Sequence, residues 1–381
     1  AAFWVMQFSI FSLLVSVTQV PYNASIFGHE RMNAYAYISI VEVLLKLGSV
    51  IMIQYCFADK LLAFGALNMG VTILTALTYR FYCVRNFLNC RYVRYWSALL
   101  FKELFSYIGW SLIGNLAWTF NSQGMNILIN MFFGPVFNAT RGIASSVESA
   151  VSSFLYNFIT PAVPPIIKAY AAGDIDEMIR LSLRSSKLGF LLFMCLSLPL
   201  ISVMNPILKL WLIAPPPQSW TFCLLSLIYI QCNSLGGTLQ NMVQATGKVK
   251  RYQLSNGIVK IMALPIVYII YKCGGDVVAY LWTLILTSIV GLMVQLDAVR
   301  RLIDSFKISD YLKKVIMPAL TAYLLPFLLS FYFSCMEMES LKMMETVAIM
   351  VVICLFSVWF IGFTGHERSW ILNIAKSKLY R

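Results

Sequence analysis

Long apolar runs separated by short polar segments repeat along almost the whole chain. A run of roughly 20 residues is the length of α-helix that crosses about 30 Å of hydrocarbon at about 1.5 Å per residue. The runs are continuously apolar rather than alternating, which excludes a transmembrane β-barrel. The long and polar segments 104–133 and 136–167 leave open whether each is one helix or two. The pattern predicts eleven membrane-crossing segments, over residues 3–26, 34–57, 61–79, 104–133, 136–167, 188–208, 219–245, 253–271, 275–298, 315–333 and 344–364.

The composition agrees with a membrane protein and excludes most soluble classes. Hydrophobic residues make up 60% of the 381 residues, and charged residues only 12%. A typical soluble domain has about 25% charged residues. A cytosolic enzyme, a disordered chain and a secreted disulfide scaffold are therefore excluded. The sequence predicts an all-α polytopic membrane protein.

The basic residues set the predicted orientation. Of the 29 Lys and Arg residues, 22 fall in one alternating set of loops and 4 in the other. Positive charge accumulates on the cytoplasmic side of membrane proteins, so the richer set and the C-terminus are expected to face the cytoplasm. This orientation accounts for most of the net charge of +13 without a nucleic-acid partner. The basic, aromatic segment 89–103 is expected to lie on the anionic inner leaflet as an amphipathic connector, the alternative being a solvated linker.

Nothing in the sequence indicates an enzyme, a metal centre or a cofactor. The two histidines, His29 and His366, lie next to predicted membrane edges, and most of the nine cysteines are isolated within apolar runs. We expect the cysteines, including Cys83 and Cys90 in one basic loop, to be reduced. The sequence has no phosphate-binding loop, nucleophile-elbow motif or zinc-protease motif. Any transport is therefore expected to use an ion gradient or the gradient of the substrate itself.

Polar side chains recur at helical spacing inside several predicted spans, where polar groups are costly. In 104–133 and 136–167 they fall on one face of each helix. Segments 219–245 and 253–271 also carry polar residues. Such faces meet either another helix, through hydrogen bonds, or a wet cavity, and their number favours the cavity. The candidate substrate-binding residues are Gln123, Asn126, Asn130, Asn138, Arg141, Glu148, Asn256 and Lys260.

The charged residues at membrane depth are the sharpest of these candidates. Arg141 and Glu148 are seven residues apart on one helical face, so they form either an internal ion pair or a site where Arg141 binds a phosphate group. Lys260 has no carboxylate on its own helix and needs a partner elsewhere. Glu42 and Lys46 are one turn apart, which favours a self-neutralising pair over a functional role.

Several short stretches in residues 15–250 carry a family resemblance. They are 20–24, 29–32, 36–43, 121–130, 132–142, 170–174, 184–187 and 244–248, and the stretch 132–142 ends in Asn138-Ala139-Thr140-Arg141-Gly142. Together they resemble the bacterial polysaccharide (O-antigen or capsule) flippases of the Wzx type. That family belongs to the superfamily that also holds the multidrug MATE exporters. After about residue 300 the likeness is only one of hydropathy.

The resemblance implies fourteen spans in two six-helix bundles and a trailing pair. It divides the chain into 1–88 (the remainder of the first bundle), 89–103 (the connector), 104–299 (the second bundle) and 300–381 (the trailing pair and tail). Because the chain begins with Ala1 and enters an apolar run at once, we expect three spans to precede it.

The resemblance also implies an activity and a location. The family moves undecaprenyl-pyrophosphate-linked oligosaccharide across the bacterial inner membrane, through a cationic cavity that opens alternately to each side. The expected partners are this substrate, the membrane lipids and the polysaccharide assembly machinery. A MATE-type drug or cation antiporter is the alternative with the same fold. A membrane polysaccharide polymerase or glycosyltransferase is less favoured, because the predicted outer loops are short.

Overall fold

The computed structural model describes residues 2–56, 59–87, 90, 96–212, 214–336, 340–365 and 367–369. Within these residues the elements are all helical, and no strand occurs. Ten helical segments in the described part are long and apolar enough to cross a membrane. These findings confirm the predicted all-α, multi-pass membrane architecture.

The predicted span 104–133 is present but is not one of these ten segments. It forms α4 (Ala98–Phe133), a single helix of 36 residues. Polar residues are spread along this helix, so it has no uninterrupted stretch of span length as apolar as those of the ten segments. The helix is therefore unbroken, which answers the question that the sequence left open.

Two predicted spans are interrupted. The span 136–167 becomes α5 (Pro135–Ile159), a 3₁₀ turn at Thr160–Ala162 and α6 (Val163–Ala171). A proline at position 161, which cannot donate a backbone hydrogen bond, accounts for that interruption. The span 219–245 becomes α9 (Ser219–Ser234) and α10 (Gly237–Ala245), with a break at Leu235 and Gly236.

Several boundaries differ from the predicted ones because charged residues continue a helix beyond its apolar core. α7 (Ile175–Ser202) begins well before the predicted 188, and the Asp174 side chain caps it by accepting a hydrogen bond from the backbone N–H of Glu177 at 3.0 Å. α8 (Met204–Trp211) follows as a separate short helix. α3 (Lys60–Asn86) likewise runs past the predicted end at 79.

The first of two compact units comprises residues 1–97. It contains α1 (Ala2–Gly28), α2 (Met32–Cys56) and α3, and α3 packs against both other helices. A small core of Ile26, Tyr79, Cys83 and Phe87 holds one end of this unit together. The thiols of Cys83 and Cys90 are free.

The second unit comprises residues 98–381 and has α7 at its centre. Many α7 side chains are fully buried, among them Phe193, Met194 and Leu198. α11 (Lys250–Lys272) packs between α4 and α12 (Ala279–Leu302), and α9 packs against α5 and α12. The division into 104–299 and 300–381 remains a prediction.

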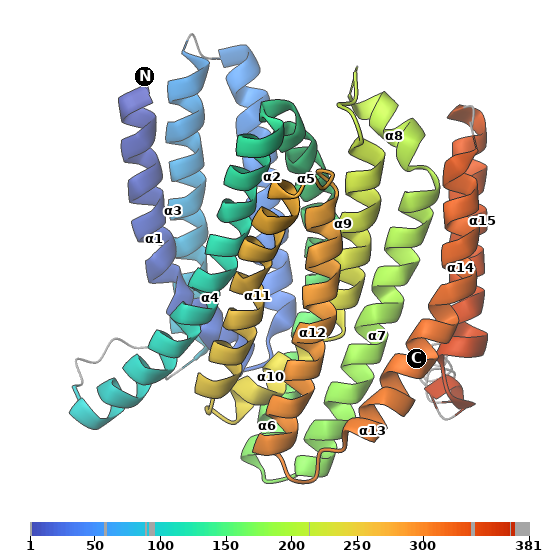
Figure 1. Cartoon of the computed structure of the whole chain (residues 1–381). Helices are drawn as coiled ribbons and strands as arrows, with labels where there is room; N and C mark the ends of the chain where they lie inside the picture. Colours follow the sequence, from blue (N-terminus) through green and yellow to red (C-terminus); the bar gives the residue numbers. More distant parts are fainter. Residues whose placement is uncertain are drawn as a thin grey trace. The chain divides into compact units, whose positions relative to one another are not determined.

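The last helices pack against α7 (Figure 1). They are α13 (Ile308–Tyr311), a π-helical turn at Leu312–Ile316, α14 (Met317–Cys335), α15 (Ser340–Ser357) and a second π-helical turn at Val358–Gly362. The Ser330 hydroxyl of α14 donates to the Leu198 carbonyl at 2.6 Å, which ties α14 to α7 near the C-terminal end of α7. The trailing helices are thus an integral part of the second unit.

Candidate functional site

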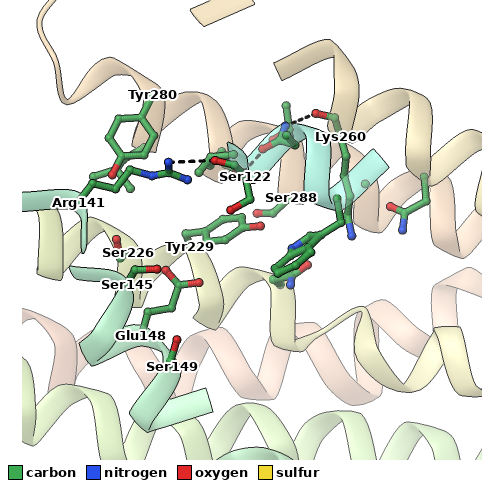
Figure 2. Close-up of a pocket in the computed structure, with 18 of the residues that line it drawn as sticks. Ser122, Arg141, Ser145, Glu148, Ser149, Ser226, Tyr229, Lys260, Tyr280 and Ser288 are labelled. Carbon is green, nitrogen blue, oxygen red and sulfur yellow. Dashed lines mark hydrogen bonds between the residues drawn. The ribbon is translucent and has the colours of Figure 1, made fainter. Parts of the chain in front are cut away.

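A polar cavity of about 180 Å³ lies inside the second unit. Its walls come from α4, α5, α9, α11 and α12 (Figure 2). Three charged residues, four amides and six Ser or Thr residues line it, together with three aromatic residues, two leucines and a glycine. These residues are Trp118, Asn121, Ser122, Arg141, Ser145, Glu148, Ser149, Ser226, Tyr229, Asn233, Asn256, Lys260, Tyr280, Leu281, Leu284, Thr287, Ser288, Gly291 and Gln295.

Arg141 is held in place at one wall of this cavity. Its Nη1 donates to the Ser122 carbonyl at 3.0 Å and to the Asn126 side-chain oxygen, both on α4. Its guanidinium carbon lies 5.6 Å from the centroid of the Tyr280 ring, a cation–π distance. Within the described part of the chain no ion pair joins Arg141 to Glu148. The predicted alternative of an internal ion pair is therefore not formed, and Arg141 keeps further N–H donors for a ligand.

Lys260 and Asn256 line the same cavity from α11, one turn apart. The Lys260 carbonyl accepts a hydrogen bond from the Asn121 side chain, which fixes α11 against α4. In the described residues the Lys260 ammonium makes neither an ion pair nor a hydrogen bond with a side chain. The Asn256 side-chain oxygen accepts a long hydrogen bond of 3.4 Å from Gln295. Lys260 is thus a second basic residue of the cavity, and it forms no ion pair with a carboxylate of the described residues.

The structure does not bring every predicted residue to the cavity. Asn126 does not line the cavity itself but accepts a hydrogen bond from Arg141, which does. Its side chain also donates to the Gln123 side chain at 3.2 Å. Gln123 and Asn130 are exposed on other sides of α4, and Asn138 is half-buried outside the lining.

The orientation of α4 explains why Gln123 and Asn130 do not line the cavity. Its buried face carries Ala117, Asn121, Met125 and Ile129 and packs on α11. Gly124 permits this close approach, because a Cβ there would collide with the Leu264 side chain of α11. The small residues, rather than the polar ones, decide which face of α4 is buried.

Sequence reasoning missed several lining residues and overestimated others. Tyr229, Tyr280 and Gln295 line the cavity, but single polar or aromatic residues in apolar helices give no periodic signal. Gln231 is one of the polar residues of segment 219–245, yet it donates to the Phe190 carbonyl at 2.9 Å and joins α9 to α7. Of the two predicted alternatives for this residue, the hydrogen bond to another helix is therefore formed, and Gln231 does not line the cavity.

The charged pair in the first unit behaves as the sequence indicated. Lys46 lies 2.6 Å from Glu42, and both side chains are partly exposed. An exposed pair one helical turn apart neutralises itself and contributes little to stability. The self-neutralising interpretation is confirmed.

Comparisons with known proteins identify the fold. No protein-family model and no curated protein matches the chain. A crystal structure of a MATE point mutant matches with a TM-score of 0.58 and 13% identity, covering 70% of this chain and 62% of that one. A MOP superfamily transporter from Pyrococcus furiosus matches with a TM-score of 0.58 and 15% identity, covering 70% and 62%. A MATE structure in complex with MaL6 matches with a TM-score of 0.56 and 11% identity, covering 79% of both chains.

These likenesses define the class of the fold. At this level of identity they show the arrangement of helices alone, which is that of the MATE-type transporters. The chain spans 62% of the length of the MATE mutant. The protein is therefore a multi-pass membrane protein with a transporter fold.

Proposed function

We propose that the chain belongs to a flippase that translocates undecaprenyl-pyrophosphate-linked oligosaccharide across the bacterial inner membrane by alternating access, driven by an ion gradient. The observation that carries the proposal is the pair of cations, Arg141 and Lys260, in one polar cavity. Arginine stays charged in any protein environment, and its planar fork suits phosphate oxygens. The charge asymmetry of the loops supports a cytoplasmic C-terminus.

Arg141 is prepared for a pyrophosphate group in a specific way. Ser122 and Asn126 occupy Nη1 and fix the guanidinium plane, so the remaining donors have a defined direction. Ordering this side chain in advance removes part of the entropy that binding would otherwise lose. Hydrogen bonds to a charged group contribute about 1.5–3 kcal/mol, so the loss of Arg141 is expected to weaken binding about tenfold or more.

The first test is translocation in liposomes that contain the protein and a fluorescent undecaprenyl-pyrophosphate oligosaccharide. A membrane-impermeant quencher measures how much of the fluorescent lipid each leaflet holds. We expect Arg141→Gln to slow translocation about tenfold or more. The matched control is Arg180→Gln, because Arg180 has a 61% exposed side chain at the start of α7 and is outside the cavity. Equal rates in Arg141→Gln and the unmodified protein would refute the proposal.

A MATE-type drug or cation antiporter is the second candidate. One observation favours it: Glu148 lies in the same cavity without an ion-pair partner in the described residues. The Pyrococcus furiosus transporter, for which reverse polarity of the binding pocket suggests a different function, shows why pocket charge is the property to test. Tetraphenylphosphonium is a suitable cationic probe. Binding of this cation that depends on Glu148, with no binding of undecaprenyl pyrophosphate, would replace the flippase proposal with the antiporter.

A further inference from the structure

One wall of the cavity combines a carboxylate with several hydroxyl groups. Ser145, Glu148 and Ser149 lie within one turn of α5, on the same helical face. Ser226 and Tyr229 face the cavity from α9, which packs against α5. Figure 2 shows Glu148 between the two α5 serines, with the α9 residues beside them. We call these five residues the hydroxyl wall.

The polar groups of the hydroxyl wall are not used within the protein. Two other serines of α5 donate to a carbonyl one turn back: Ser146 to Gly142 at 2.9 Å and Ser153 to Ser149 at 2.7 Å. In the described part of the chain, the side chains of the hydroxyl wall have no hydrogen-bond partner. The wall is therefore free to bind a ligand that offers both donors and acceptors.

The hydroxyl wall and the two cations suit different parts of a ligand. An ionised carboxylate only accepts hydrogen bonds, and a pyrophosphate group has no donor to give it. The charge of Glu148 also repels pyrophosphate. A sugar ring supplies several O–H donors and acceptors, and the flat Trp118 ring adds an apolar surface. The buried side-chain oxygen of Gln295, another lining residue, likewise has no partner and accepts hydrogen bonds.

We propose that the hydroxyl wall is the subsite for the sugar bonded directly to the pyrophosphate, and that Glu148 restricts this sugar to neutral ones by repelling a carboxylate. This inference rests on the proposed flippase function and adds a substrate class to it. Arg141 and Lys260 then hold the pyrophosphate. Glu148 accepts hydrogen bonds from the ring hydroxyls, and the Ser145 and Ser226 hydroxyls donate to them or accept from them.

The test measures binding of three lipids to the full chain in nanodiscs. The lipids are undecaprenyl pyrophosphate, its N-acetylglucosamine derivative and its glucuronic acid derivative. We expect the N-acetylglucosamine lipid to bind about tenfold more tightly than the bare pyrophosphate. The glucuronic acid lipid should gain nothing, because its carboxylate meets the charge of Glu148.

The Glu148→Gln variant gives the decisive readout, since its two effects have opposite signs. The loss of a charged acceptor should remove most of the roughly tenfold gain in affinity that N-acetylglucosamine adds over the bare pyrophosphate. The loss of repulsion should strengthen binding of the bare pyrophosphate and of the glucuronic acid lipid. A merely structural role of Glu148 would weaken all three. The Ser226→Ala variant removes one hydroxyl and no charge. It should lower only the increase in affinity that the sugar adds over the bare pyrophosphate.

Neighbouring serines provide the matched control. Ser146→Ala, next to Ser145 but committed to its own helix, should leave all three affinities unchanged, whereas Ser145→Ala should lower the gain from the sugar. If Glu148→Gln keeps the gain from the sugar but loses a dependence on sodium or protons, Glu148 is a cation site and the inference is wrong. If the bare pyrophosphate binds but the sugar adds nothing, the subsite is wrong and the flippase stands. If none of the lipids binds, both proposals fall.

Discussion

A buried ion pair joins the end of the trailing helices to α7 and offers a quantitative test of the fold. The Lys187 ammonium lies 2.5 Å from a Glu367 carboxylate oxygen, with side chains that are 3% and 19% exposed. The same carboxylate oxygen accepts hydrogen bonds from the backbone N–H and the hydroxyl of Thr364, at 2.8 and 2.9 Å. Without Lys187, the Glu367 carboxylate would still have its hydrogen bonds from Thr364. Without Glu367, the buried Lys187 ammonium would lose its ion-pair partner.

Removing one partner is expected to have unequal effects. Glu367→Ala leaves the ammonium of Lys187 buried and unpaired, which costs about 3 kcal/mol, the lower end for a buried pair. Lys187→Met leaves a carboxylate that is partly exposed and still bonded to Thr364, so it should cost about half as much. The double variant Lys187→Met with Glu367→Leu should recover most of the loss, because apolar residues can replace a buried pair.

Thermal unfolding in detergent with a thiol-reactive fluorescent dye measures these differences. The thiols of Cys223 and Cys354 are fully buried in the second unit, so they react only when it unfolds. We expect Glu367→Ala to lower the apparent Tm by at least about 5 °C. The control Glu42→Gln, which breaks an exposed pair of the first unit, should change the stability by no more than about 0.5 kcal/mol. If Glu367→Ala is no more destabilising than Glu42→Gln, the reasoning is wrong.

The same pair predicts a pH dependence. Burial raises the pKa of Glu367, but the hydrogen bonds from Lys187 and Thr364 lower it by more, so the pKa is below 4.5. A carboxylate with a depressed pKa in the folded state stabilises the protein above its unfolded pKa and loses this contribution as the pH falls through the folded pKa. The Tm difference between the unmodified protein and Glu367→Gln should therefore be full near neutral pH and shrink below about pH 4.5. A difference that grows with acid would contradict this assignment.

Three further predictions concern the cavity and the break between α9 and α10. Gly236→Ala should weaken binding of undecaprenyl pyrophosphate in nanodiscs without reducing expression, because a Cβ at this position collides with the Gln295 side chain and pushes it into the cavity; Gly142→Ala, where nothing lies near the added Cβ, is its control. Tyr311→Phe should destabilise the protein by about 1 kcal/mol in the dye assay, because it removes the donor to the Leu235 carbonyl at 2.6 Å. The Arg141→Lys variant should translocate about as slowly as Arg141→Gln, since a lysine cannot contact Ser122 and Asn126 and also bind phosphate in a bidentate way. Full activity of Arg141→Lys would show that the positive charge alone suffices.

The apolar runs predicted the helices well because each span must satisfy its own backbone hydrogen bonds in lipid. The early start of α7 was missed because its acidic and basic residues resembled a loop, although Asp174 followed by Glu177 is a helix-capping pattern. The break at Gly236 was missed because glycine also occurs within intact membrane helices. The predicted helix boundaries are therefore wrong in two situations. In one, polar residues form the start of a helix, and in the other, a helix ends without a polar residue to mark its end.

The candidate site was predictable only in part, for a physical reason. Charge at membrane depth is costly enough that Arg141, Glu148 and Lys260 stand out in the sequence, and all three line the cavity. Amides are less costly, so they serve packing as readily as binding, and Gln123 and Asn130 fell on the wrong faces of α4. The side on which a helix packs is set by small residues such as Gly124, which carry no chemistry of their own.

The break between α9 and α10 has a consequence for the trailing helices. At this break the Leu235 carbonyl accepts hydrogen bonds from Tyr311 at 2.6 Å and from Ser186 at 3.0 Å. Leu235 is buried in the second unit, where its carbonyl needs a partner, so the Tyr311 and Ser186 hydroxyls do for the broken helix what water does for an exposed loop. A shortened chain that ends before α13 would keep the Ser186 donor to this carbonyl but lose the shorter bond from Tyr311. The interrupted helix and α13 are thus coupled through this one carbonyl, although more than seventy residues of sequence separate Leu235 from Tyr311.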